Sequence, residues 1–401
     1  MGGLRGGTAA GKHLRDVAAI LIHLALWSQL GVLTRIYLDK LFSICKFQDF
    51  GVCLTSEGIK HNTLGAYFTD VASNMLGCFI MGLVASSTTI GLRSKKAMVI
   101  FPANSRFQAA TGLHVGLRTG YCGSLTTFAS WEYSLVTSLI GGLGKEGGQW
   151  SEFLWGLVIG LQLSLSSYAL GRLCALLIDR YLTPGGTADT DLLQTDSERM
   201  AELQRKQEGK LTMAEEVLEA EETGEEPPSQ GESPAKPHAA IDIAAAIALA
   251  LLTALFIALT AVDNSPKHAA RRGRWLAVLF GPIGCTLRWA LSFLNFKLSG
   301  EWNWLPVGTL AANMLACTVN FLIGGTSSRI GKLTPWSTLV TYSIRTGFSG
   351  ALSTVSTYAA EVHVLLKLIP DKIHAATYAV GSLLLGALLG VLIYGSMVWA
   401  H

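Results

Sequence analysis

Long apolar stretches alternate with short polar ones along most of the chain. A membrane-spanning helix needs about 20 predominantly apolar residues. Nine stretches meet this length requirement, namely residues 17–42, 67–91, 107–141, 152–178, 239–262, 275–296, 306–325, 337–369 and 373–399. The pattern therefore predicts an all-α membrane protein with nine transmembrane helices.

The third and eighth stretches are longer than one straight helix needs, and both contain glycines and hydroxyl residues. Residues 120–131 read GYCGSLTTFASW and residues 347–358 read GFSGALSTVSTY, each directly after an Arg-Thr pair. Backbone that breaks at membrane depth must find hydrogen-bond partners in the protein or in a lined cavity. The motif therefore predicts a broken third helix in each half, and broken helices near the midplane are where transport sites are built.

The two halves of the chain repeat the same polar residues in the same order. Arg35 and Asn74 precede the first motif, and Arg288 and Asn313 precede the second. Apolar helices that are alike by chance would not keep this order, so we infer an internal duplication. Residues 239–262 belong to neither repeat, and a single linking helix there inverts the second repeat relative to the first.

These features divide the chain into four parts. Residues 1–182 are the first four-helix repeat, and residues 183–238 are a soluble acidic linker rich in polar residues and proline. Residues 239–262 are the linking transmembrane helix, and residues 263–401 are the second, inverted repeat.

Composition and charge narrow the class of protein. The 401 residues are 50% hydrophobic and only 15% charged, whereas about a quarter of the residues in soluble domains are charged. A net charge of +3 is too small to predict a nucleic-acid partner, so the expected surroundings are a lipid bilayer. Sequence motifs of zinc proteases, serine hydrolases and phosphate-binding loops do not occur, which argues against an enzyme.

The basic residues give mixed evidence for orientation. Those near the N-terminus and after the second stretch favour a cytoplasmic N-terminus. With nine crossings, the basic loop at 267–274 then lies outside, against the same rule. The hydropathy of residues 239–262 is the stronger signal, so we expect nine crossings.

Four polar side chains lie inside the apolar stretches: Arg35, Asn74, Arg288 and Asn313. Such residues either form a functional site or join helices by hydrogen bonds, and equivalent positions beside two predicted breaks favour a site. Amide and hydroxyl donors replace the water that a small anion loses, and the edge of an aromatic ring is electropositive. The residues alone thus predict an anion pathway without identifying the anion. Carbonyls freed at the breaks are suited to a small cation.

The run GxxGxxTTF on the third stretch, with an earlier Asn and an Arg in the first stretch, resembles the fluoride channel (Fluc) family. The fused, nine-helix arrangement is similar to the eukaryotic fluoride exporters of that family, and the likeness covers both repeats. The resemblance implies a passive, fluoride-selective channel of the plasma membrane. It also implies two pores, a central structural sodium ion bound by carbonyls, and function as a monomer, because the fused repeats replace two subunits.

In that family each pore contains two aromatic rings, an asparagine and a track of hydroxyl groups. Phe128 and Tyr358 match the aromatic positions of one pore, and the other pair is Val355 with Trp131. The further positions that the resemblance assigns to the fluoride pathway are Asn74, Asn313, Thr309, Ser356, Thr357, Tyr378, Ser382 and Glu361. The matched sodium ligands are the carbonyls of Gly123, Thr126, Gly350 and Ser353, and the matched structural arginines are Arg35 and Arg288.

The repeats differ at these positions, which predicts unequal pores. Asp70 stands in the first repeat where the second has Thr309. A carboxylate repels an anion about 4 Å away by roughly 4 kcal/mol at an effective dielectric of about 20. We expect one working pore, formed chiefly by the second repeat with Phe128, and one degenerate pore. The alternative is a proton- or sodium-coupled inverted-repeat transporter in which Glu132 and Glu361 titrate as coupling sites.

Overall fold

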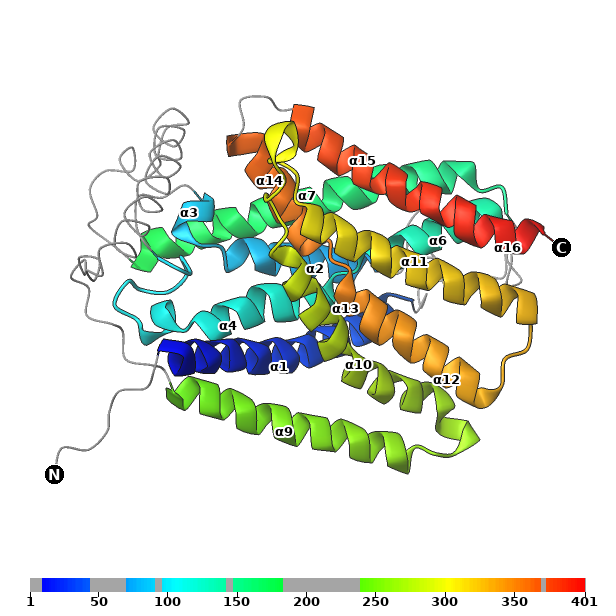
Figure 1. The fold of residues 1–401 in the computed structure, drawn as a ribbon, viewed down its shortest axis with the longest axis horizontal. Helices are drawn as coiled ribbons and strands as arrows, with labels where there is room; N and C mark the ends of the chain where they lie inside the picture. Colours follow the sequence, from blue (N-terminus) through cyan, green and yellow to red (C-terminus); the bar gives the residue numbers. More distant parts are fainter. Residues whose placement is uncertain are drawn as a thin grey trace, which may run out of the picture.

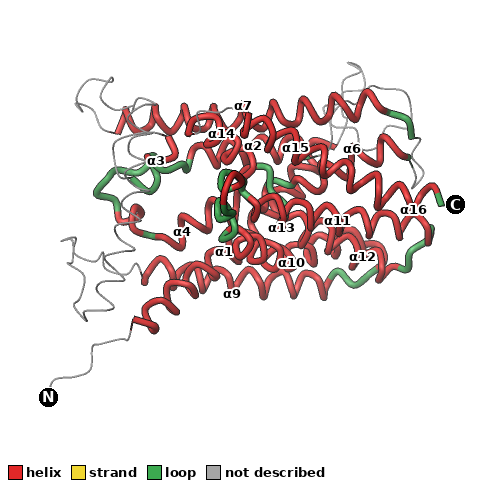
Figure 2. The backbone as a smooth tube through the Cα atoms, turned by 45° about the horizontal axis from the view of Figure 1, so that its top comes forward, coloured by secondary structure: helices red, strands yellow, loops and turns green. Residues whose placement is uncertain are grey.

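The computed structural model describes residues 9–43, 70–90, 96–141, 147–182, 239–368 and 373–400. Helices and short connections account for all of these residues, and no strand occurs among them (Figure 2). The all-α prediction is confirmed. The predicted linker at 183–238 lies outside the described residues, so its structure stays a prediction.

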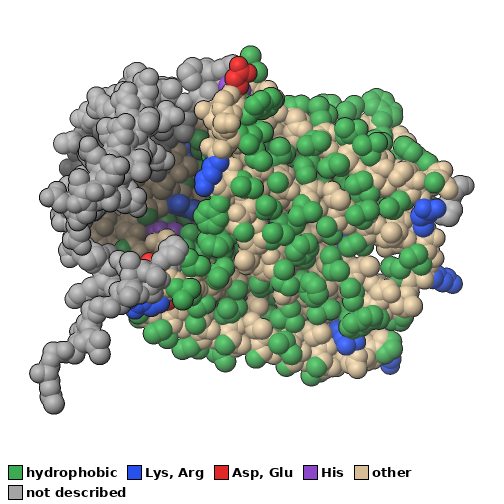
Figure 3. All heavy atoms as spheres, viewed as in Figure 1, with side chains coloured by type: hydrophobic (Ala, Val, Ile, Leu, Met, Phe, Trp, Pro, Cys, Tyr) green, Lys and Arg blue, Asp and Glu red, His purple; other side chains and the backbone are tan. Residues whose placement is uncertain are grey.

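Six of the described helices are long and apolar enough to cross a membrane. They are α1 (Ala9–Ser43), α7 (Trp150–Leu182), α9 (Ala239–Val262), α10 (Ala269–Ser292), α11 (Val307–Ile330) and α15 (Ile373–Gly390), which continues through η7 (Val391–Gly395) into α16 (Ser396–Trp399). Large apolar side chains cover their outer surface, and in Figure 3 Lys and Arg gather toward the two ends of this apolar band. Such a surface is suited to a bilayer, so the chain is a membrane protein.

The second apolar stretch is shorter as a helix than its hydropathy predicts. Helix α2 (Val71–Leu83) has 13 residues, and a turn separates it from the four-residue helix α3 (Ser87–Ile90). The hydroxyl of Ser87 exchanges hydrogen bonds with the backbone of Lys96. Polar contacts of this kind compete with helix continuation, which explains the early end.

The third and eighth stretches are interrupted as the glycine motifs predict. The third contains α4 (Thr111–Val115), the π-helical η3 (Gly116–Cys122), α5 (Gly123–Leu125) and α6 (Phe128–Ile140), and the eighth contains α12 (Pro335–Ser343), the π-helical η6 (Ile344–Ser349), α13 (Gly350–Leu352) and α14 (Ser356–Leu368). Thr126 (φ −90°, ψ 150°) and Ser353 (φ −81°, ψ 159°) are extended rather than helical. Each stretch therefore breaks at the same position of the motif.

The broken helices lie at the centre of the bundle. Helix α1 packs against α10 and η3, while α10 packs against η6 and α13. Helix α9 lies along α1 and α10 at the lower edge of Figure 1. Close approach depends on glycine, because a Cβ on Gly284 of α10 would lie 2.1 Å from the Phe348 carbonyl oxygen. This packing brings α5 and α13 together.

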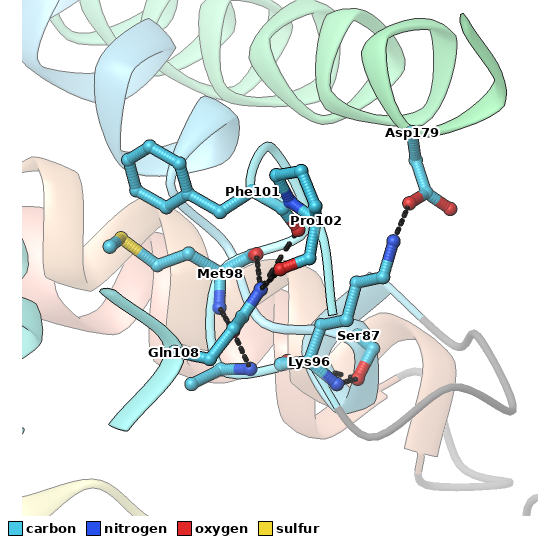
Figure 4. Close-up of polar contacts among 8 residues, drawn as sticks. Ser87, Lys96, Met98, Phe101, Pro102, Gln108 and Asp179 are labelled. Atoms are coloured by element: carbon cyan, nitrogen blue, oxygen red, sulfur yellow. Dashed lines mark hydrogen bonds and ion pairs between the residues drawn. The ribbon is translucent and has the colours of Figure 1, made fainter. Parts of the chain in front are cut away.

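The connection from α3 to α4, which includes η2 (Arg106–Ala109), is held by one glutamine and one ion pair (Figure 4). Gln108 donates to the carbonyls of Met98 and Phe101 at 2.9 Å, and its Oε1 accepts from the Met98 amide at 3.1 Å. Lys96 forms an ion pair with Asp179 of α7. The connection is thereby fixed to the end of α7.

The connection from α9 to α10, which includes η4 (Pro266–His268), is also held by polar contacts. Asp263 accepts from Arg271 Nε and Nη2 at 2.6 Å and from the Trp275 indole at 2.8 Å. A carboxylate thus pairs with part of the basic loop at 267–274. A further 3₁₀ turn, η5 (Gly300–Trp302), lies between α10 and α11.

Candidate functional site

The two breaks cap each other across the molecule. Thr126 Oγ1 accepts from the amides of Val355 and Ser356 at 3.1 Å, at the start of α14. Ser353 Oγ accepts from the Ala129 amide at 3.2 Å, at the start of α6. These hydroxyls add to the N-caps within each repeat, where Thr127 Oγ1 accepts from the Ser130 amide and Thr354 Oγ1 accepts from the Thr357 amide, both at 3.3 Å.

Each predicted asparagine is bonded to the break of its own repeat. Asn74 Oδ1 accepts from the Thr127 amide at 2.8 Å, and Asn74 Nδ2 donates to the Thr127 carbonyl at 3.3 Å. Asn313 makes the same pair of bonds to Thr354, at 2.8 and 3.2 Å. The amides therefore satisfy the backbone groups that the broken helix frees. This geometry supports a structural role at the site for both residues.

The two first-helix arginines cross to the opposite repeat. Arg35 of α1 donates to the Gly350 carbonyl at 2.6 Å and to the Thr346 carbonyl. Arg288 of α10 donates to the Thr119 carbonyl at 2.6 Å. Both side chains are buried. Their bonds to the broken helices are the bracing contacts that the sequence analysis predicts.

The predicted aromatic pair is in direct contact. The ring centroids of Phe128 and Tyr358 are 5.7 Å apart with an interplanar angle of 73°, so one ring presents its edge to the other. Tyr358 also lies 5.4 Å from Tyr378, and Phe128 lies 5.7 Å from Trp131. Val355, by contrast, supplies no ring at the first aromatic position of the second repeat. One line of rings therefore runs through the centre.

A closed hydrogen-bond cluster adjoins this line of rings. Thr309 Oγ1 and Asn295 Nδ2 donate to Glu361 Oε1 at 2.5 and 3.0 Å. Tyr378 donates its hydroxyl to Glu361 Oε2 at 2.7 Å. The structure thus brings together three residues predicted for the pathway, Thr309, Tyr378 and Glu361.

The remaining predicted hydroxyls lie nearby with bonds of their own. Ser382 donates to the Tyr378 carbonyl at 2.7 Å, Ser356 accepts from Thr126, and Thr357 accepts from Thr354. Sequence reasoning missed Asn295. It lies in the turn that follows the end of α10 at Ser292, three residues beyond the helix, where helical periodicity no longer applies.

At the equivalent positions of the first repeat there is a cavity. It has a volume of about 1370 Å³ and is bordered by parts of α1, α6, α10 and α12. Asp39, Asp70, Thr127, Ser130 and Ser134 are among the residues that line it. Asp39 accepts from Ser73 at 3.0 Å and is close enough to Asp70 for the two carboxylates to interact. Sequence reasoning missed Asp39, one turn after Arg35.

Glu132 lies apart from both polar groups. Its side chain is completely buried, and neither carboxylate oxygen has a hydrogen-bond partner among the described residues. Glu361, in contrast, has the three donors described above. The two carboxyl groups named as coupling sites in the alternative function are therefore in different environments.

Backbone carbonyls at the two breaks are the predicted ligands of a cation. The Thr127 and Thr354 amides bond to asparagine, so the carbonyls of Gly123 and Gly350 lose their usual helical donors. The Gly350 carbonyl, however, accepts from Arg35. A Cβ on Gly123 would lie 1.7 Å from Arg288 Nη1, so a guanidinium also covers that glycine. The two glycine positions are therefore shared with the guanidinium groups of Arg35 and Arg288.

Known proteins are similar to about a quarter of the chain. The fluoride-specific ion channel FluC of Serratia proteamaculans is 40% identical over 94 residues, which is 23% of this chain and 68% of the relative. The FluC channels of Chromobacterium violaceum and Bordetella avium are 38% identical over 114 residues and 43% over 110, covering 27% of this chain and 86% and 80% of the relatives.

A family-wide comparison covers both halves. The profile of the CrcB-like protein family, described as camphor resistance (CrcB), matches residues 22–172 and residues 275–395. The two matched regions together make up more than half of the chain, and each contains one arginine, one asparagine and one broken helix of the site. The chain belongs to the CrcB family.

Proposed function

We propose that this protein is a fluoride channel that exports fluoride passively down its electrochemical gradient. The observation that carries the proposal is the edge-to-face contact of Phe128 and Tyr358, continuous with the hydroxyl cluster around Glu361. Its relatives are named as fluoride-specific ion channels, and a channel of this family is not an enzyme.

The geometry explains how a small anion crosses without its water. Ring edges face the ion at the narrow part of the path, and hydroxyl groups replace the hydrogen bonds of water. The donors of Thr309, Asn295 and Tyr378 converge on Glu361, which keeps them oriented. Fluoride takes over these donors in turn as it passes the aromatic pair.

Only one of the two pores conducts in this proposal. The working pore uses Phe128 from the first repeat and the Glu361 cluster of the second. The equivalent position in the first repeat has the carboxylates of Asp39 and Asp70 in an open cavity. Three donors offset the charge of Glu361 in the working pore, whereas two neighbouring carboxylates add their repulsion in the first repeat, and Val355 leaves that pore without its first ring.

The proposed architecture has nine crossings in two inverted repeats, and the chain works as a monomer. In Figure 1, α1 begins at the left end of the bundle and α16 ends at the right, as an odd number of crossings requires. Contacts between α1 and α10, and between α5 and α13, supply an interface within one chain. We place the N-terminus in the cytoplasm and the protein in the plasma membrane, where the inside-negative potential drives an anion outward.

A structural sodium ion at the crossing of the breaks remains part of the proposal. The predicted ligands are the carbonyls of Gly123, Thr126, Gly350 and Ser353, and the Gly350 carbonyl would exchange its bond from Arg35 for the ion. When bound, the ion would supply a positive charge between the repeats. Replacing sodium by a large organic cation during unfolding tests this site, since a lower Tm without sodium is expected.

The experiment that tests the function is fluoride efflux from liposomes that contain the purified chain. Valinomycin and a potassium gradient set the membrane potential, and chloride efflux is measured in parallel. Fast fluoride release that follows the potential, without chloride release, is the expected result. Uphill fluoride movement driven by a proton or sodium gradient would favour the coupled transporter instead.

A further inference from the structure

Glu132 is the one acidic residue described in the core that has no partner for either oxygen. It lies on α6 directly after Trp131, its side chain has 0% exposure, and both oxygens lack a hydrogen-bond partner within the described residues. An ionised carboxylate in such a place has lost its water without compensation. The group is therefore stable there as a neutral acid, which has one O–H donor.

The surroundings of Glu132 are part of the line of rings. A Cβ on Gly386 of α15 would lie 3.1 Å from Cδ of Glu132 and 3.2 Å from a ring carbon of Phe128. Two titratable groups, Cys317 of α11 and Tyr358 of α14, are near enough to interact electrostatically with Glu132. Glu132 thus faces the aromatic pair on the side where α15 has no side chain.

The charged and titratable groups of the other neighbouring elements face elsewhere. Arg345 of η6 lies 3.9 Å over the ring of Tyr133, and Tyr394 of η7 also packs on that ring. Glu152 of α7 accepts from Ser138 at 2.7 Å. The residues of α13 are Gly, Ala and Leu and do not titrate. Neither oxygen of Glu132 has a hydrogen bond to a counter-charge among the described residues.

Helix α15 explains why a carboxyl is useful at this point. Tyr378, Ser382 and Gly386 follow one another at intervals of four residues, so they form a row on one face of the helix. The first two have hydroxyl groups, and the third has no side chain. The Glu132 carboxyl occupies the space beside Gly386. By the repeat symmetry, Glu132 corresponds to Ala359 and Gly386 corresponds to Tyr168. At the equivalent place the large side chain therefore comes from α7, and α14 contributes only an alanine.

We propose that Glu132, in its protonated form, is a fluoride-contacting residue that supplies the hydroxyl missing at Gly386. The neutral carboxyl donates a hydrogen bond to fluoride as the ion passes Phe128, and ionisation of Glu132 closes the path by repulsion. This inference rests on the proposed fluoride channel. It adds a proton-dependent step to that channel without coupling transport to a proton gradient.

The first test moves the hydroxyl from one helix to the other. Glu132→Ala removes the donor and is expected to lower fluoride efflux about tenfold, the effect of losing one hydrogen bond to a charged group. Glu132→Ala combined with Gly386→Ser puts a hydroxyl back where the carboxyl was, and efflux is expected to recover. The removed carboxyl leaves room for the Ser side chain, provided the Phe128 ring shifts by a few tenths of an ångström.

The second test uses pH. Wild-type efflux is expected to fall as the pH is raised and the carboxyl loses its proton, whereas Glu132→Gln keeps a donor that does not titrate and should lose that fall. Protein-free liposomes measure the leak of hydrofluoric acid at each pH. A Glu132→Ala variant with wild-type efflux, or a Glu132→Gln profile identical to wild type, overturns the proposal.

A third measurement does not depend on transport. A hydrophobic carbodiimide reacts with protonated carboxyl groups in membranes, and mass spectrometry of the α6 peptide is expected to find one adduct on Glu132 that Glu132→Gln lacks. Absence of the adduct in folded protein overturns the neutral acid. Wild-type protein that releases no fluoride overturns the proposed function and this role together, whereas failure of the hydroxyl exchange alone overturns only the role of Glu132.

Discussion

The two repeats share their backbone frame and differ in the side chains placed on it. In both, an asparagine holds the break and an arginine from the opposite repeat contacts the broken helix. The second repeat then has Thr309 and Glu361 in a closed cluster, where the first has Asp70 and Ser134 beside a cavity. The groups that hold the breaks occur in both repeats, and the cluster proposed for the fluoride path occurs in one.

A second pair of equivalent residues shows the same division. Arg118 donates to the Val84 carbonyl at 2.9 Å and to the Ala97 carbonyl at 2.5 Å. Arg345 lines the cavity with its guanidinium 3.9 Å from the centre of the Tyr133 ring, a cation–π contact. One arginine therefore joins two segments of the backbone, while the other presents positive charge to an opening.

The aromatic positions give the largest expected difference between the repeats. Phe128→Ile removes the ring edge of the working pore, and fluoride efflux is expected to fall about a hundredfold, equivalent to about 2.7 kcal/mol in barrier height. Val355→Ile at the equivalent position is the matched control and should stay within about threefold of wild type. Efflux from liposomes measures both. Equal loss in the two variants would contradict a single working pore.

The asparagines should behave alike, because they belong to the shared frame. Asn74→Ala and Asn313→Ala each leave a buried amide and carbonyl unpaired, and each is expected to lower the free energy of unfolding by about 3 kcal/mol. Asn320→Ala, at a buried asparagine that lines the cavity, is the control and should cost less. Denaturant unfolding in detergent measures all three. A stable Asn74→Ala variant would show that the first break is held by other groups.

The equivalent arginines Arg118 and Arg345 should differ in how much each contributes to the free energy of unfolding. Arg118→Gln loses two backbone contacts and should lower the free energy of unfolding by about 2 kcal/mol. Arg345→Gln should leave it within about 1 kcal/mol. Because the cavity belongs to the degenerate pore, Arg345→Gln should also leave fluoride efflux within about twofold of wild type at low and at high salt. A loss of efflux in that variant would mean that ions enter through the cavity.

The smallest expected effect concerns Asp263, which lies in the connection between α9 and α10. The hydrogen bonds from Arg271 and Trp275 lower the pKa of Asp263 from 3.8 to about 2. A depressed pKa stabilises the fold above about pH 4, and the contribution disappears as the pH falls toward about 2. The Tm of wild type should therefore drop toward that of Asp263→Asn as the pH is lowered. Parallel Tm curves for the two proteins would exclude this linkage.

Much of the frame could be predicted from the sequence because it depends on local chemistry. Glycine and threonine in the motif predict a break wherever the helices lie, and duplicated Asn and Arg mark its neighbours. Asp39 shares a face of α1 with Arg35, so periodicity was sufficient to find it, whereas Asn295 lies in the turn after α10 and has no such signal. The early end of α2 was missed because Ser87 bonds to a loop that hydropathy does not describe.

Other features depend on which helices meet and were beyond a sequence pattern. Nothing in the order of residues shows that Thr126 caps the helix that begins at Ser356 in the other repeat. The surroundings of Glu132 also depend on tertiary packing, since α15 places Gly386, which has no side chain, beside it. Pairing across repeats follows from packing, and packing is not local.

The crossed caps also bear on how the chain is completed in the membrane. Helix α6 is synthesised long before Ser353, so its first turn at first has only the cap that Thr127 of its own repeat supplies. The Ala129 amide gains the Ser353 hydroxyl as a partner only after about two hundred more residues have been inserted. Assembly in the membrane therefore has a late step, in which the two breaks exchange these hydrogen bonds. During the interval before that step, cellular quality control can recognise a chain whose second repeat is missing.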